Sequence, residues 1–247
     1  MSRKNFFFTI LLCFLCHYGV AQNINIETGY YTIDDRYDTL PHNAIDTIIN
    51  KYKPEVDQKV AKKIGESELE MSAYMPESLL SNFSTDVLLK KGADFLGEKV
   101  DLSILNIGGI RATMPKGDVT LGNIFEIYPF DNIVDILYIK GSYLKELFDF
   151  FAKKGMQPIG NARLKVRDKK IEEVLIGGEL LDETKIYKVA TLNYLRTGGD
   201  GMGILNNAEK VINTRRQFRD MIQDYISDKY NLGEKINSTL DNRVIIY

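Results

Sequence analysis

The chain has 247 residues, of which 44% are hydrophobic, so it is long enough to bury a core without disulfide staples. Its 32 basic and 34 acidic residues give a formal net charge of −2. Proteins that bind the phosphate backbone of nucleic acid carry a basic excess, so we expect no nucleic-acid partner.

The N-terminus has the pattern of a signal peptide. Arg3 and Lys4 precede an uncharged run over residues 5–18, and a small-x-small pattern follows at residues 19–21. The apolar run is shorter than the roughly 20 residues that a transmembrane helix needs. We therefore expect residues 1–21 to be a cleaved signal peptide, the protein to be exported to the periplasm or the extracellular space, and no stable membrane span.

Histidine and cysteine are scarce outside this segment. Cys13, Cys16 and His17 lie within it, which leaves His42 as the one histidine and no cysteine. A phosphoesterase with two metals needs several His and Asp ligands. The composition therefore predicts no metal site and no catalytic residue in this chain, and His42, next to Pro41, is more typical of a loop residue than of a general base.

The first expected elements are a strand and two helices. Partial alternation of apolar and polar residues predicts a strand over residues 23–32, within an N-terminal extension over 22–45. Helical spacing of apolar residues predicts a helix over 44–64 and a second over 77–91, which ends at Gly92.

Strands dominate the rest of the chain. Short apolar runs rich in β-branched residues predict strands over 101–105, 133–139, 162–166, 171–176 and 186–192. A helix capped by Gly141 and Ser142 is expected after the second of these, and a hairpin turn at Gly177-Gly178. A last helix buries the face Phe218, Met221, Ile222 and Tyr225. This order favours an α+β class, as a single mixed α/β domain over 46–247.

A glycine turn follows the strand over 101–105. In the segment from Asn106 to Arg111, two glycines let the backbone approach a ligand, and the arginine offers a planar fork to phosphate or carboxylate oxygens. The alternative is a plain strand-ending turn with a solvated arginine.

Two further clusters carry aromatic and polar residues. In Tyr128-Pro129-Phe130-Asp131-Asn132 the Phe130 ring can stack on a base and Asn132 can hydrogen-bond it, although Phe130 fits a core position equally well. In the segment from Asn193 to Gly201, Asp200 lies among three glycines and can accept hydrogen bonds from vicinal hydroxyls. Such a segment also makes plain turns. Together the three clusters supply the parts of a nucleotide pocket.

In their order and spacing, these clusters and the step Lys140-Gly141-Ser142 resemble the C-terminal domain of the 5′-nucleotidase and UDP-sugar hydrolase family. The resemblance extends over about residues 46–225. It implies that Arg111 contacts the substrate phosphate, with Asn106 close by. It also implies that Phe130 and Tyr194 sandwich the base, that Asn132 contacts the ligand, and that Asp200 binds the ribose hydroxyls.

Three positions depart from the family pattern. Ile107 replaces the first of three motif glycines, and Tyr74 stands where the family carries a second phosphate-binding arginine. Loss of that arginine removes charge that favours a dianionic phosphate. Tyr194 replaces a phenylalanine but keeps its stacking face.

Members of this family begin with a metallophosphoesterase domain that holds the catalytic metals. The resemblance therefore implies a nucleotide-recognition domain of a phosphoester hydrolase in nucleotide catabolism. We expect it to act with a separately encoded metallophosphoesterase carrying two divalent metals, with no cofactor in this chain. The alternatives are a stand-alone nucleotide- or nucleoside-binding module without catalysis, and an interaction domain that keeps the fold.

Overall fold

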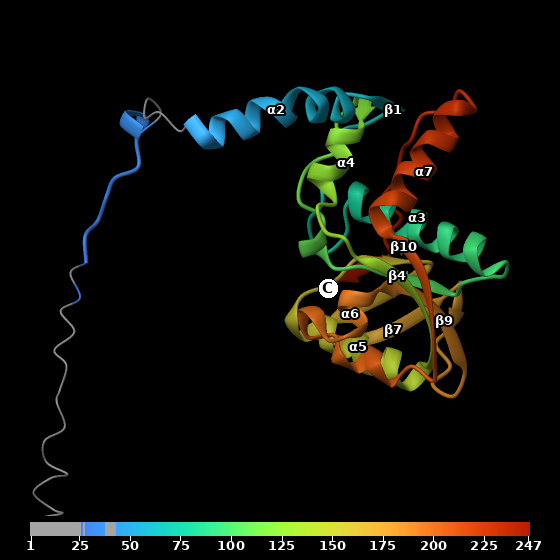
Figure 1. The fold of residues 1–247 in the computed structure, drawn as a ribbon. Coiled ribbons are helices and arrows are strands. Elements are labelled where there is room, and N and C mark those ends of the chain that lie inside the picture. Colours follow the sequence, from blue (N-terminus) through green and yellow to red (C-terminus); the bar gives the residue numbers. More distant parts are fainter. Residues whose placement is uncertain (1–25, 27, 38–42) are drawn as a thin grey trace, which may run out of the picture. The chain divides into compact units, whose positions relative to one another are not determined.

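A computed structural model describes residue 26 and residues 28–37 and 43–247 (Figure 1). The expected signal peptide and His42 lie outside the described residues. The chain divides into two units, residues 1–48 and 49–247. The described part of the first unit holds the 3-10 helix η1 (Asp35–Tyr37) and the start of α2 (Asn43–Val60).

The strand expected over residues 23–32 is not formed at its described positions, 26 and 28–32. Ile26, Tyr30 and Tyr31 are all exposed. A strand needs a neighbour to pair its backbone groups, and the alternating sequence pattern alone supplies none. The prediction was therefore wrong at these positions.

The second unit contains three sheets. A five-stranded sheet has the order β10-β4-β9-β2-β5, in which only β2 and β9 pair in parallel. A four-stranded sheet has the order β11-β6-β7-β8, and β1 pairs with β3. The strands are β1 (Lys63–Ser67), β2 (Leu102–Ile104), β3 (Gly117–Thr120), β4 (Ile133–Lys140), β5 (Ile159–Gly160), β6 (Ala162–Arg167), β7 (Lys170–Ile176), β8 (Glu179–Leu180), β9 (Ile186–Leu192), β10 (Lys210–Gln217) and β11 (Val244–Ile246).

Helices cover the five-stranded sheet. Helix α3 contacts β2, β5 and β9, α7 packs on α3, and α5 contacts both β4 and β7. Besides the end of α2, the helices of this unit are α3 (Leu79–Leu96), α4 (Leu121–Ile127), α5 (Gly141–Lys154), α6 (Asn193–Arg196) and α7 (Phe218–Asn231), with the 3-10 turns η2 (Ile107–Gly109), η3 (Gly199–Gly201) and η4 (Gly203–Asn207). The fold is therefore α+β, as predicted.

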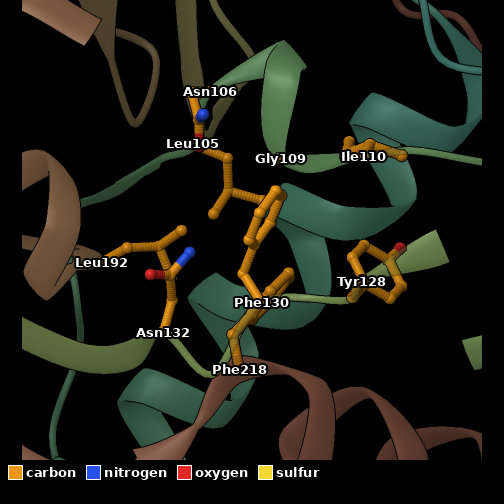
Figure 2. A pocket seen from close by; sticks show the side chains of 9 residues that line it. All are labelled: Leu105, Asn106, Gly109, Ile110, Tyr128, Phe130, Asn132, Leu192 and Phe218. Carbon is orange, nitrogen blue, oxygen red and sulfur yellow. The ribbon is translucent and has the colours of Figure 1, made fainter. Parts of the chain in front are cut away.

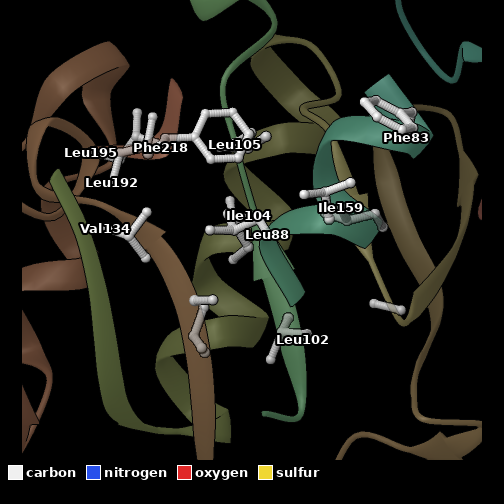
Figure 3. Close-up of a cluster of buried hydrophobic side chains, with 14 of the residues drawn as sticks. Phe83, Leu88, Leu102, Ile104, Leu105, Val134, Ile159, Leu192, Leu195 and Phe218 are labelled. Carbon is white, nitrogen blue, oxygen red and sulfur yellow. The ribbon is translucent and has the colours of Figure 1, made fainter. Parts of the chain in front are cut away.

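Part of the hydrophobic core lies between α3 and the five-stranded sheet (Figure 3), and the core continues to α5 and the four-stranded sheet. Leu88 of α3 faces Leu102 and Ile104 of β2, and all three are fully buried. The near-continuous apolar strands β2, β4 and β9 are typical of strands covered on both faces. The loops at the ends of these strands are thus held by a rigid core.

Helix α3 is longer than the sequence predicted. It does not end at Gly92 but at Leu96, with Gly97 in the left-handed conformation at φ 71°. Gly92 lies where the helix meets the sheet, because a Cβ atom there would be 3.1 Å from the Ala190 Cβ. Ser78 begins the helix with a capping box, in which its hydroxyl accepts the Ser81 N–H.

The first helix is shorter than predicted. Helix α2 ends at Val60 instead of reaching residue 64, because Lys63–Ser67 pairs as β1 with β3. The strands β4, β6, β7 and β9 and the helix α7 confirm the predictions. Gly177 and Gly178 form the expected hairpin turn between β7 and β8, both with positive φ.

Gly141 is the first residue of α5 rather than its cap. Lys140 takes the cap position, and the N–H groups of Gly141 and Ser142 donate to the carbonyls of Lys185 and Glu183. A Cβ at Gly141 would be 2.1 Å from the carbonyl oxygen of Asp182. The glycine of the Lys140-Gly141-Ser142 step is therefore required by a close backbone approach.

Candidate functional site

Three loops meet at one edge of the five-stranded sheet. Strands β2 and β9 are parallel, so their carboxyl ends lie together, and β4 runs antiparallel to β9, so its amino end lies at the same edge. The pairing of Val134 with Leu192 and a hydrogen bond from Thr191 Oγ1 to the Ile104 carbonyl, 2.9 Å long, fix this arrangement. The three sequence clusters follow or precede these strand ends.

All six residues singled out in the sequence line one pocket of about 330 Å³ at this edge. This volume is in the range of small-molecule sites. Asn106 is buried, Asn132 is half-buried, and the other four are exposed. The lining residues are Asn106, Gly108, Arg111, Phe130, Asn132, Tyr194 and Asp200.

A hydrogen-bond network joins two of the three loops. The Asn106 Nδ2 donates to Asp200 Oδ2 at 2.6 Å, and the Tyr194 hydroxyl donates to Asp200 Oδ1 at 2.9 Å. The Asn106 Oδ1 is buried and has no hydrogen-bond partner among the described residues. The hydrogen bond from the Tyr194 hydroxyl to Asp200 and the negative charge of Asp200 raise the pKa of this hydroxyl, because both oppose its ionisation.

The loop that carries Asp200 has an unusual backbone. Asp200 adopts the left-handed conformation at φ 52°, between Gly198 and Gly201, which both have positive φ. Aspartate tolerates this conformation better than most residues. The Tyr194 ring lies against the backbone of Gly199, where a Cβ would be 2.5 Å from two ring atoms. The loop therefore folds closely around the tyrosine ring.

Arg111 is the one cationic side chain among the described residues that line the pocket. Its backbone N–H donates to the Ile127 carbonyl at 2.8 Å, and its Nη1 donates to the Gly108 carbonyl at 3.3 Å. The guanidinium is thus held beside the glycine turn and still has donors available. It can bind a phosphate or a carboxylate group.

Phe130 and Tyr128 have opposite environments although they lie two residues apart. Phe130 is 48% exposed and lines the pocket, so the core position considered from sequence is excluded. Tyr128 is 3% exposed, hydrogen-bonds Ser84 through its hydroxyl at 2.7 Å, and packs edge-on against Phe218. Burial raises the pKa of the Tyr128 hydroxyl. Tyr128 anchors the loop and Phe130 projects from it.

A smaller apolar cavity of about 20 Å³ lies next to the pocket (Figure 2). Phe130, Asn106 and Asn132 line both spaces. The remaining walls of the small cavity are Leu105, Gly109, Ile110, Tyr128, Leu192 and Phe218.

Comparison with known proteins gives the family. The sequence pattern of the 5′-nucleotidase C-terminal domain matches residues 60–207. The chain belongs to this family. It is 28% identical to the protein UshA of Escherichia coli strain K12, over 72% of this chain and 32% of UshA. It is 23% identical to the trifunctional nucleotide phosphoesterase protein YfkN of Bacillus subtilis, over 92% of this chain and 16% of YfkN.

Solved structures share the fold. A 5′-nucleotidase precursor from Thermus thermophilus superimposes with a TM-score of 0.71 at 24% identity, over 82% of this chain and 43% of that protein. This chain spans about a third of the length of UshA and a smaller share of YfkN.

Several residues of this 5′-nucleotidase C-terminal domain that hold the site were not found from the sequence. Gln157 accepts the Ile107 N–H through Oε1 at 3.0 Å. Asp135 is fully buried and accepts the Arg196 Nε and the Asn213 Nδ2, each at 2.6 Å. Arg196 belongs to α6, which also carries Tyr194. No local motif marks these contacts, because each joins segments at least 50 positions apart.

Tyr74 is not among the residues that line the pocket. Its side chain is exposed, and its backbone N–H donates to the Ser78 Oγ at the start of α3. In this domain, therefore, Tyr74 contributes no group to the described pocket walls in the place of the family arginine.

Within the described ranges, no group of three or more His, Cys, Asp or Glu side chains is arranged to hold a metal ion. In the same part of the chain, no helix has the length and apolar character needed to cross a bilayer.

Proposed function

We propose that this domain recognises a nucleotide or nucleoside for a 5′-nucleotidase-type phosphoester hydrolase in nucleotide catabolism. The observation that carries the proposal is the convergence of six side chains from three loops on one pocket. They supply a cation, two aromatic rings, two amides and a carboxylate. This combination matches the phosphate, base and sugar of a nucleotide.

Each part of the ligand has a candidate partner. Arg111 would bind the phosphate, because its planar donors fit phosphate oxygens. The exposed rings of Phe130 and Tyr194 would stack on the base, and Asp200 would accept the ribose hydroxyls. Asn132 and Asn106 would hydrogen-bond the ligand at its base or sugar edge.

We propose that hydrolysis takes place on a separately encoded, exported metallophosphoesterase that holds two divalent metals. These metals would activate water for attack on the phosphate. The support is that the relative YfkN is a nucleotide phosphoesterase by name. The recognition domain would then present the ligand to the metals.

Calorimetric titration with AMP and with adenosine tests the recognition step. The wild-type chain should bind both, and Phe130→Ala and Asp200→Ala should each weaken binding without loss of the fold, as judged by circular dichroism. Binding that is unchanged in both variants would favour the alternative of an interaction domain that keeps the fold.

A mixing experiment tests the catalytic partnership. AMP hydrolysis is measured for the chain, for an exported metallophosphoesterase from the same organism, and for the mixture, each with Mn²⁺ or Zn²⁺ added. The proposal expects the mixture to exceed the sum of the two separate rates. Equal rates for the chain alone and for the mixture would contradict it.

A stand-alone binding module is the second candidate. The pocket is built by three loops of one domain, so it needs no second chain to complete the walls described above. This candidate is favoured if AMP binds with the same affinity with and without the metallophosphoesterase and no mixture hydrolyses it.

We also propose export of the protein to the periplasm or the extracellular space, on the basis of the N-terminal pattern at residues 3–21. N-terminal sequencing of the protein recovered from its native compartment tests this. A mature chain that begins at Gln22 is expected, and a chain that keeps residues 1–21 in the cytoplasm would contradict the proposal.

A further inference from the structure

We infer that the hydroxyl group of Tyr194 is a positioning group for Asp200, and that through Asp200 it makes the pocket select ligands with a free vicinal diol. The inference rests on the proposed function and adds a role for Tyr194 beyond stacking on a base.

Two donors hold the Asp200 carboxylate from two sides. The Tyr194 hydroxyl donates to Oδ1 at 2.9 Å, and the Asn106 Nδ2 donates to Oδ2 at 2.6 Å. Each carboxylate oxygen therefore has one fixed hydrogen bond, which sets the plane of the carboxylate. Hydrogen bonds to a charged group are the stronger ones, so this orientation is well held.

The backbone of the loop does not by itself fix the position of Asp200, and the hydrogen bond from the Tyr194 hydroxyl does. Asp200 is left-handed at φ 52° and is flanked by glycines, so the backbone itself permits other loop conformations. The Tyr194 ring is seated on Gly199, the residue before Asp200. The hydroxyl ties the far end of that ring to the Asp200 side chain, which closes the loop around the ring. In Tyr194→Phe the ring would keep its contact with Gly199 and lose the hydrogen bond to Asp200.

The Asp200 carboxylate keeps acceptor capacity for a ligand at this corner of the pocket. One N–H of the Asn106 amide donates to Asp200 Oδ2 and the Tyr194 hydroxyl donates to Asp200 Oδ1, so each carboxylate oxygen receives one of these two hydrogen bonds. Each carboxylate oxygen can accept a second hydrogen bond. Two neighbouring hydroxyl groups supply two donors at the spacing of a carboxylate, whereas a ligand without them leaves these acceptors unsatisfied.

The test compares two nucleosides that differ only in the diol. Binding of adenosine and of 2′,3′-dideoxyadenosine is measured by calorimetry for the wild-type chain and for Tyr194→Phe. Because the lost hydrogen bond is charge-assisted, adenosine affinity should fall about five- to tenfold. The affinity for 2′,3′-dideoxyadenosine should change less than about twofold, because the stacking face is kept.

Tyr230→Phe is the matched control. Tyr230 has the same exposed fraction as Tyr194, 42%, and its ring contacts Lys63 on another part of the domain. This variant should leave both affinities unchanged. In an Asp200→Ala background, Tyr194→Phe should have no further effect on adenosine, because the group that it positions is gone.

The outcomes separate this inference from the proposed function. If Tyr194→Phe leaves adenosine affinity unchanged, or lowers the affinity for both nucleosides equally, the hydroxyl does not act through the diol and the inference is overturned. If the wild-type chain binds the two nucleosides equally well, the diol selectivity is overturned while nucleoside binding stands. If it binds neither nucleoside nor AMP, the proposed function fails and the inference with it.

Discussion

The Oε1 atom of Gln157 accepts the backbone N–H of Ile107 at 3.0 Å, from a loop 50 positions further along the chain. Ile107 is the residue that replaces a motif glycine, and it begins the turn η2 beside Arg111. The N–H of this residue is therefore engaged by the protein itself. The side chain of Gln157 ties the glycine turn to the segment that leads into β5.

Gln157→Ala should weaken AMP binding by about three- to tenfold, because the Ile107 N–H loses its partner and the turn that holds Arg111 loosens. Gln157→Glu keeps an acceptor oxygen and serves as a comparison that preserves the contact. Calorimetry with AMP measures the effect. Equal affinities for the wild-type chain and Gln157→Ala would show that the turn is held without Gln157.

Arg111→Ala should lower AMP affinity about tenfold or more and leave adenosine affinity within about twofold, because Arg111 is the cation among the described lining residues and adenosine has no phosphate. The wild-type AMP affinity should also fall between 50 and 300 mM salt more steeply than the adenosine affinity. A comparable loss for both ligands would indicate that Arg111 shapes the pocket instead of binding phosphate.

Phe130→Ala should reduce AMP affinity about tenfold, since stacking of an aromatic ring on a base contributes about 1–3 kcal/mol. Its effect on the free energy of unfolding should stay within about 1 kcal/mol, because the ring is already exposed. Phe95→Ala is the control, as Phe95 is 44% exposed and does not line this pocket. Equal affinity losses in the two variants would remove the stacking role.

Asp135→Asn should destabilise the domain by about 2–3 kcal/mol, below the usual cost of breaking a buried ion pair because Arg196 is partly exposed. Urea unfolding measures this. AMP affinity should fall as well, because Arg196 fixes the helix that carries Tyr194. Asp149→Asn, which breaks an exposed pair with Lys145, should cost less than about 1 kcal/mol. Similar costs for the two variants would argue against a special role for Asp135.

Gly141→Ala should destabilise the domain by about 2–3 kcal/mol, because the new methyl group collides with the Asp182 carbonyl and backbone must move. Gly203→Ala is the comparison, since a Cβ at Gly203 meets nothing within 4 Å. Thermal and urea unfolding report both. A neutral Gly141→Ala would mean that the segment around Asp182 yields freely, and the close approach would then not explain this glycine.

Local patterns predicted the elements that local physics controls. The apolar run at 133–139 became β4, and the helical face that includes Phe218 and Met221 became α7. Gly92 was misread as a helix end, because a glycine in a sequence does not tell whether it stops a helix or lets a helix approach a sheet. In the structure Ala190 and Ile136 lie against it, and the helix continues to Leu96.

The candidate site was predictable as a set of residues but not as a network. Asn106, Arg111, Phe130 and Asp200 stood out because glycine, proline and aromatic residues cluster around them in the sequence. The contact between Asn106 and Asp200 spans 94 positions, and no local rule links them. Likewise, Phe130 and Tyr128 are both aromatic, and only packing against Phe218 and Ser84 decided which one is buried.

The sequence by itself determined the α+β class, the family and the three clusters that line the pocket, because these depend on residue type and near-neighbour spacing. The tertiary structure alone decided that the clusters meet at one sheet edge, that Gln157 and Asp135 support them, and that the Tyr194 hydroxyl holds Asp200. These relationships depend on the pairing of β2, β4 and β9, which joins residues far apart in the chain. Strand order and register arise from packing of the whole core, so they cannot be read from any single segment.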